Sequence, residues 1–340
     1  MRRFFKNFCA VVLFYLAPYA VFAHEVYVLT PAEFQAGLAY RGFDLTAAFE
    51  SADNLKTFLV IGAIVTVLLI LNFFFQRSRT GRAFQSFIER GQRFGPFIVR
   101  LAVSASFFFS ALEWSFLGPE LALAALPFAE VLRVALFALS GLFLLGLFTE
   151  IAAFVALGIY TIATWKFGLY LATYFNYVGE LVVLFLLGFR YFSLDGLLFG
   201  PKKSFSFLKQ YETTIVRICY GIALCYVAIS VKFLHPAVME IVVNKYNLTQ
   251  FHWLFPSDPR LVTLGAALAE LFLGLCIIFG FELRLMVLVT LFYITLSLIF
   301  FKELVWPHLM LYGISLSLLF NKETFTLDGL FEKHVKKFRN

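Results

Sequence analysis

Charged residues are scarce in this chain: 14% of its 340 residues are Asp, Glu, Lys or Arg, whereas 61% are hydrophobic. Soluble domains carry about 25% charged residues, because polar side chains must cover a water-facing surface. The composition therefore excludes a soluble enzyme and predicts an integral membrane protein in a lipid bilayer. The net charge of +7 falls in short segments between apolar runs, so membrane topology explains it and no nucleic-acid partner is expected.

Cysteine is also rare, with four residues in the chain. No two of them have CxxC spacing, which excludes a zinc ribbon and a thioredoxin-type redox pair. A P-loop, a GxGxxG turn after a strand, an HExxH helix and a nucleophile elbow are missing as well. Any chemistry must therefore be sought among ionisable residues inside or beside the apolar runs.

Residues 1–23 have the parts of a secretory signal peptide: a basic start, an apolar centre and small residues at the cleavage position. Cleavage would make His24 the mature N-terminus, outside the cytoplasm; an uncleaved anchor is the alternative. Residues 24–56 are mixed and polar, and they predict a short outer (periplasmic) segment with one helix.

Nine apolar runs follow, each near the roughly 17–25 residues that a membrane helix needs. Backbone groups in hydrocarbon need internal partners, so runs of this length are predicted to be helices. They cover residues 57–75, 97–116, 130–148, 151–168, 174–190, 213–231, 261–280, 284–301 and 304–320. The predicted fold class is all-α integral membrane, with about nine transmembrane helices.

Basic residues mark one side of this arrangement. The predicted inner segments 76–96, 201–212 and 331–340 are rich in Arg and Lys, whereas the outer segments are sparser. Positive charge favours the cytoplasmic side. The sequence thus predicts a multi-pass protein of the bacterial inner (plasma) membrane, with the mature N-terminus outside and the C-terminus in the cytoplasm.

Two segments recur in the chain. Residues 98–101 are similar to 215–218, and the FxLDGL segment at 192–197 returns at 325–330, with four apolar runs inside each interval. Four spans bring the chain back to its starting side, so the copies are parallel repeats. The predicted domains are one lone helix (57–75) and two parallel four-helix bundles, 97–200 and 213–330.

The second copy resembles the DoxX family of integral membrane proteins, and the first copy resembles it more loosely. The resemblance rests on Arg217, residues 232–236, Glu270, Gly274, Gly280, Arg284, residues 306–308 and residues 327–329. It implies a small helical bundle linked to sulfur-compound or thiol oxidation and the quinone pool, working with a separate redox or sulfur-handling protein. The first copy has no carboxylate matching Glu270, and Glu180 lies near the position of His308, so only the second copy is expected to keep a site.

Ionisable side chains inside a membrane span are costly and point to function. Glu270 lies about nine residues into its span, and by depth Lys232 is its most reachable partner. With His308, which opens the last span, these residues are the candidate catalytic set. Arg217 and Arg284 are candidates for a structural or proton-relay role. A buried pair that only pins helices together is the competing interpretation.

The histidines gather on the predicted outer side. His24, His235, His252 and His308 lie there and could supply ligands to copper, zinc or haem, although none is paired at helical spacing. Hydrogen-bonded interfacial histidines are the simpler interpretation.

A quinone is the other cofactor considered for the outer end of the second copy. Trp306 would line an aromatic mouth, and Lys232 and His308 would bind the ring oxygens; an aromatic belt at the interface explains the tryptophans equally. The leading hypothesis is a redox-linked membrane subunit. A small-molecule carrier or permeation protein and a non-catalytic assembly scaffold are the alternatives.

Overall fold

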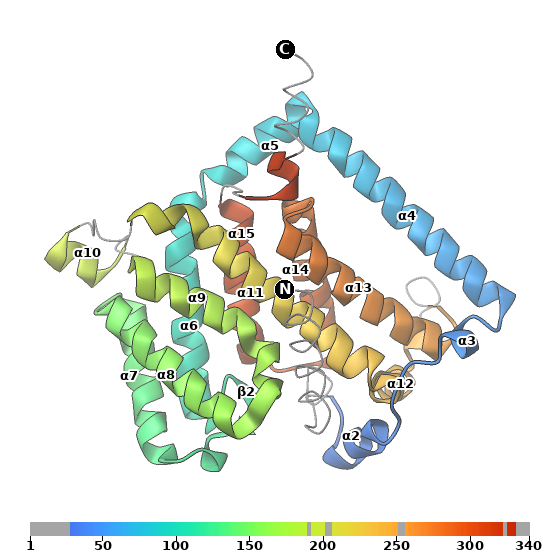
Figure 1. The fold of residues 1–340 in the computed structure, drawn as a ribbon, viewed down its shortest axis with the longest axis horizontal. Coiled ribbons are helices and arrows are strands. Elements are labelled where there is room, and N and C mark those ends of the chain that lie inside the picture. The colour runs from blue at the N-terminus through green and yellow to red at the C-terminus, as the bar shows by residue number, and fades with distance from the viewer. Residues whose placement is uncertain (1–27, 189–191, 201–205, 251–255, 322–324, 331–340) are drawn as a thin grey trace, which may run out of the picture.

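The computed structural model describes residues 28–188, 192–200, 206–250, 256–321 and 325–330. Over these residues the chain is almost entirely helical (Figure 1). The predicted signal peptide, His24, His252, part of the linker 201–212 and the tail 331–340 lie outside the described residues.

Two short helices form the outer segment: α2 (Pro31–Leu38) and α3 (Leu45–Ala48). Thr30 and Glu33 close α2 with a reciprocal capping box, which satisfies two free backbone donors. Helix α2 packs on α12 (Pro236–Lys245), and Gly37 is so close to Val238 that a Cβ there would lie 2.7 Å from its side chain. This segment thus holds two short helices, one more than the sequence predicts.

Helix α4 (Ala52–Arg77) runs along one edge of the molecule (Figure 1). Asn54 donates to Asp258 at one end (2.7 Å), and Gln76 donates to Glu282 at the other (2.5 Å). Burial raises the pKa of Glu282, and the nearby Asp328 carboxylate raises it further. Because Asp258 and Glu282 flank α13 (Pro259–Phe279), α4 is attached beyond both ends of that helix.

The first copy begins after α5 (Arg79–Glu89) and the short turn η2 (Gln92–Phe94). A two-stranded hairpin, β1 and β2, covers the outer end of its first helix. Its elements are α6 (Gly95–Leu112), β1 (Ser115–Phe116), β2 (Gly118–Ala122), η3 (Leu123–Ala125), α7 (Ala129–Leu145), α8 (Thr149–Phe167), η4 (Gly168–Tyr174), α9 (Phe175–Leu187) and α10 (Leu194–Phe199).

The second copy repeats this order but replaces the hairpin by helix α12. Its first helix ends in a π-helical turn, η6, a feature often found at functional sites. The elements are η5 (Ser206–Tyr211), α11 (Glu212–Val227), η6 (Ala228–Phe233), α12, η7 (Leu248–Gln250), α13, α14 (Leu283–Phe301), η8 (Trp306–His308) and α15 (Leu309–Phe320).

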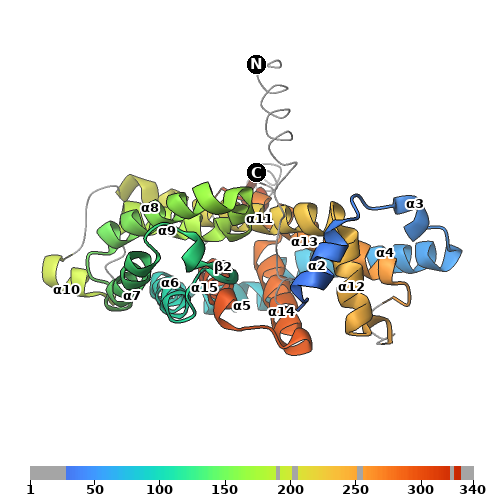
Figure 2. The ribbon, with the colours of Figure 1, turned by 90° about the horizontal axis from the view of Figure 1, so that it is seen from below.

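The two copies do not form two separate four-helix bundles. In each, successive helices pack on one another, but the fourth helix also packs on the first helix of the other copy: α9 on α11, and α15 on α6. These contacts are close, since a Cβ on Gly179 of α9 would lie 2.7 Å from Cys219 and one on Gly313 of α15 would lie 2.4 Å from Ala102. The eight helices therefore form one paired unit, which refines the prediction of two bundles. Seen from below, the molecule is elongated, with α10 at one extreme and α4 at the other (Figure 2).

The duplicated segments have a structural role. Arg100 donates to the carbonyl of Phe192, and Arg217 donates to that of Phe325 at 3.0 Å. Asp195 accepts from two backbone N–H groups at the start of α8, at 2.8 and 2.9 Å, and so caps that helix. Each repeat thus ties its first helix to its closing turn, which is why Arg and LDGL recur together.

Six helical stretches are long and apolar enough to cross a membrane, judged by length and composition over the described residues. They are Ala52–Arg77, Arg79–Leu112, Thr149–Leu187, Leu208–Phe233, Pro259–Phe279 and Leu283–Phe301. The first is exposed on nearly every side along its middle, as expected of a helix that faces lipid. The chain is thus a polytopic, helical membrane protein.

Candidate functional site

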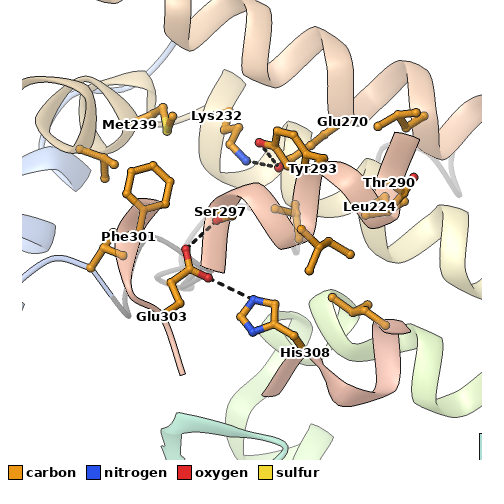
Figure 3. A pocket seen from close by; sticks show the side chains of 16 residues that line it. Leu224, Lys232, Met239, Glu270, Thr290, Tyr293, Ser297, Phe301, Glu303 and His308 are labelled. Carbon is orange, nitrogen blue, oxygen red and sulfur yellow. Dashed lines mark hydrogen bonds and ion pairs between the residues drawn. The ribbon is translucent and has the colours of Figure 1, made fainter. Parts of the chain in front are cut away.

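A mostly apolar cavity lies at the α12 end of the second copy, between α11, α13, α14 and the start of α15. The space inside it is about 60 Å³, which is room for a few water molecules. Val28, next to α2, also lines it. The polar residues that face it are Lys232, Glu270, Thr290, Tyr293, Ser297, Glu303 and His308 (Figure 3). The three candidate catalytic residues of the sequence therefore lie in one cavity.

Lys232 and Glu270 form a buried ion pair at this cavity. Their side chains are 3% and 6% exposed, and the Lys232 ammonium donates to the Glu270 carboxylate. The tyrosine hydroxyl of Tyr293 donates to the same oxygen at 3.0 Å (Figure 3). Lys232 lies in the π-helical turn η6, which shifts the phase of the helix and carries the lysine inward. The two opposite charges cancel, so this side of the cavity is polar but has no net charge.

Glu303 and His308 form a second buried pair across the cavity. The imidazole Nε2 of His308 lies 3.1 Å from one carboxylate oxygen of Glu303, and Ser297 donates to the other at 2.7 Å. The left-handed conformation of Lys302 (φ 53°) ends α14 and turns the chain, so that Glu303 points back inside. In Figure 3 the two pairs face the same space from opposite sides.

A second contact holds the imidazole ring of His308 in place. Its Nδ1 lies 2.9 Å from the carbonyl oxygen of Leu304, which only accepts, so Nδ1 carries a hydrogen. The ring therefore turns its Nε2 toward Glu303 and the apolar space.

The two arginines singled out from the sequence lie elsewhere. Arg217 ties α11 to the closing turn at Phe325, and a Cβ on Gly280 would lie 2.0 Å from its guanidinium. Arg284 donates to Glu89 at 2.9 Å and so links α14 to α5. Both residues make structural contacts at the end of the molecule opposite the cavity.

The predicted metal ligands do not come together in the described part of the chain. Among those residues no three His, Cys, Asp or Glu side chains are grouped as a metal site. His235 lies at the start of α12, beside the backbone of Leu38 and Tyr40, and partial burial lowers its pKa. His24 and His252 fall outside the described residues, and Trp306 is buried but does not line the cavity.

Sequence reasoning did not single out Tyr293, Ser297 or Glu303. Tyr293 and Ser297 are four residues apart on α14 and so share a face of that helix. Thr290 precedes them on the same face, and this weak polar stripe in a mostly apolar helix is the signal that could have pointed to them. Glu303 lies between two apolar runs, where a loop is expected, and only the turn at Lys302 brings it to His308.

The first copy has an apolar residue at the position of Glu270. Leu136 lies 146 − 136 = 10 residues before Gly146, as Glu270 lies 280 − 270 = 10 before Gly280, and it is fully buried. The predicted match of Glu180 to His308 is wrong: Glu180 is 195 − 180 = 15 residues before Asp195, whereas His308 is 328 − 308 = 20 before Asp328. Glu180 therefore lies more than one helical turn deeper.

No protein-family model, curated protein or solved structure matches the chain. The site is therefore argued from its own geometry.

Proposed function

We propose that the chain is a DoxX-like, redox-linked subunit of the bacterial inner membrane. Helix α4 and the eight paired helices would together cross the bilayer about nine times, with the mature N-terminus outside and the basic linkers inside, as the charge distribution indicates. In this orientation the cavity opens toward the outer face. A separate sulfur- or thiol-handling protein would be its partner.

The observation that carries the proposal is the cavity itself. It combines an apolar, partly aromatic lining with two balanced polar pairs on opposite sides, Lys232–Glu270 and His308–Glu303. A neutral ring with an oxygen at each end fits such a lining, whereas a net charge would lack a compensating partner. A quinone-type molecule is therefore the proposed ligand, and when bound it supplies two-electron redox chemistry.

The chain's own residues have definite roles in this proposal. Lys232 and His308 offer N–H groups to the ring oxygens, while Glu270 and Glu303 hold those donors in place. A proton held between His308 and Glu303 can be given up or taken back at Nε2. Tyr293 and Phe301 exclude water from the space between the pairs.

Ligand-dependent thermal stabilisation of purified protein by a short-chain ubiquinone analogue tests this proposal. Wild-type protein should show a saturable shift, and Glu270→Gln and His308→Ala should weaken binding tenfold or more, equivalent to about 1.4 kcal/mol. Glu120→Gln is the matched control, because Glu120 accepts from Tyr170 and, at 2.7 Å, from Tyr174 at the outer end of the first copy.

No saturable shift in the wild type would remove the ring ligand from the proposal. Solute uptake into vesicles that Glu270→Gln abolishes would favour the carrier. The scaffold would be favoured if the protein bound no quinone analogue and if both site variants still assembled with a partner protein as the wild type does.

A further inference from the structure

Polar atoms without partners gather on helix α9, between the two copies. Asn176 is 1% exposed, and within the described part of the chain neither its amide oxygen nor its nitrogen has a hydrogen-bond partner. Glu180, 2% exposed, has one carboxyl oxygen in the same state among those residues. Each such atom costs about 1–3 kcal/mol if left dry, so buried groups of this kind are ordinarily met by water.

Two small cavities adjoin these atoms. Asn176 lines one, with Tyr170, Tyr174 and Tyr177, and its space open to water is about 40 Å³. Glu180 lines the other, together with Glu212, and there the space is about 10 Å³. Since one water needs roughly 10–15 Å³ by this measure, the first cavity holds a few waters and the second is at the limit for one.

The two cavities lie one after the other along helix α9. Asn176 and Glu180 are four residues apart, on the same face of α9, and about 6 Å apart along its axis. Glu212 begins α11 at the end of the molecule where the basic segments lie. Polar side chains and spaces large enough for water thus follow one another from the start of α11, at Glu212, to Asn176 on α9.

The line stops at an apolar wall. Leu224, Val227 and Leu311 line both the cavity at Asn176 and the outer cavity of Lys232 and His308. These three side chains carry no proton-exchanging group, so they separate the two spaces chemically while leaving them adjacent.

We propose that Glu212, Glu180 and Asn176 form a hydrated proton path from the inner membrane face to this wall. Each transfer passes a proton between a carboxyl group and a neighbouring water, or between two waters, so that one O–H bond breaks and another forms, and no electron moves. The amide of Asn176 only forms hydrogen bonds to the water beside it. The inference rests on the membrane orientation proposed above, but not on the ring ligand of the outer cavity.

Infrared spectroscopy tests water access to Glu180. The wild-type minus Glu180→Gln difference spectrum should show a protonated carboxyl band that shifts as soon as the buffer is changed to D₂O. A band that persists until the protein opens globally would contradict the path, and so would a spectrum with no protonated carboxyl band.

Proton flux into vesicles tests the continuity of the path. Opening the wall with Leu224→Ala and Leu311→Ala should produce a proton flux under a potassium diffusion potential. Adding Asn176→Leu or Glu180→Gln should return it to the wild-type level. No flux, or a flux that both additions leave unchanged, would overturn the proposal.

Stability separates a blocked path from a damaged fold. Asn176→Leu removes two unpartnered polar atoms, so its melting temperature should be no lower than that of the wild type. Ubiquinone-analogue binding to Asn176→Leu should be unchanged, which distinguishes failure of this inference from failure of the outer-cavity proposal.

Discussion

Replacing Lys232 by Met removes the cation from a carboxylate that has almost no contact with solvent. Glu270 would then keep the hydroxyl of Tyr293 as a partner, but its negative charge would be uncompensated. Removing one member of a buried ion pair costs about 3–5 kcal/mol. At about 2 °C per kcal/mol for a large domain, the melting temperature should fall by about 6–10 °C.

The double variant Lys232→Met/Glu270→Leu separates charge from packing. It removes both ions and leaves apolar side chains in an apolar cavity, so it should be far more stable than the sum of the two single variants predicts. The buried thiol of Cys276 allows the measurement, because a thiol-reactive fluorescent dye reports unfolding when it gains access to it.

Lys245→Met is the matched control. Lys245 also binds a carboxylate, Glu33, at 2.7 Å, but both side chains are about one third exposed. This variant should lose much less stability than Lys232→Met, because an exposed ion pair contributes about 0–1 kcal/mol. The reasoning about Lys232 would be refuted if the two lysine variants lost the same stability, or if the double variant were less stable than both single variants.

Three further predictions concern the packing and the outer surface. Arg217→Met should lower stability by roughly 1.5–3 kcal/mol in the same dye assay, because the Phe325 carbonyl loses a charged donor. Gly221→Val should cost about 1–3 kcal/mol, since a Cβ there would lie 2.5 Å from the Gly274 carbonyl oxygen on α13, and Gly265→Ala, which meets nothing within 4 Å, should not. Lys245 and Thr30 lower the pKa of Glu33 from 4.5 to about 2, so its contribution is present above pH 4.5 and is lost as pH falls toward 2; the difference in melting temperature between wild type and Glu33→Gln should shrink over that window.

Residue type and depth predicted the centre of the candidate site. Lys232 was expected to be the partner of Glu270 because both lie at similar depth from the outer face, and the structure contains that pair. His308 was expected to look into the outer end of the second copy, and it lines the cavity. The role of these residues in catalysis stays a prediction.

The rest of the site depends on features that hydropathy does not encode. Thr290, Tyr293 and Ser297 recur on one face of α14, but Thr295 and the many apolar residues weaken that pattern, so hydropathy alone did not identify the face that points inward. Glu303 reads as a loop charge until the left-handed residue Lys302 reverses the chain. Two similar repeats also leave open whether a fourth helix packs on its own first helix or on that of its partner, and the structure shows both fourth helices on the opposite copy.

That exchange of fourth helices gives the duplication a physical meaning. A single four-helix copy would leave the faces of its first and fourth helices bare, and two separate copies would have to meet to cover them. Joining the copies in one chain makes that meeting independent of concentration. It also allows the two copies to differ in sequence. The second copy has a cavity with two buried polar pairs, whereas in the first copy the apolar Leu136 occupies the position of Glu270. The chain therefore resembles a symmetric dimer in which only one of the two equivalent positions carries polar residues.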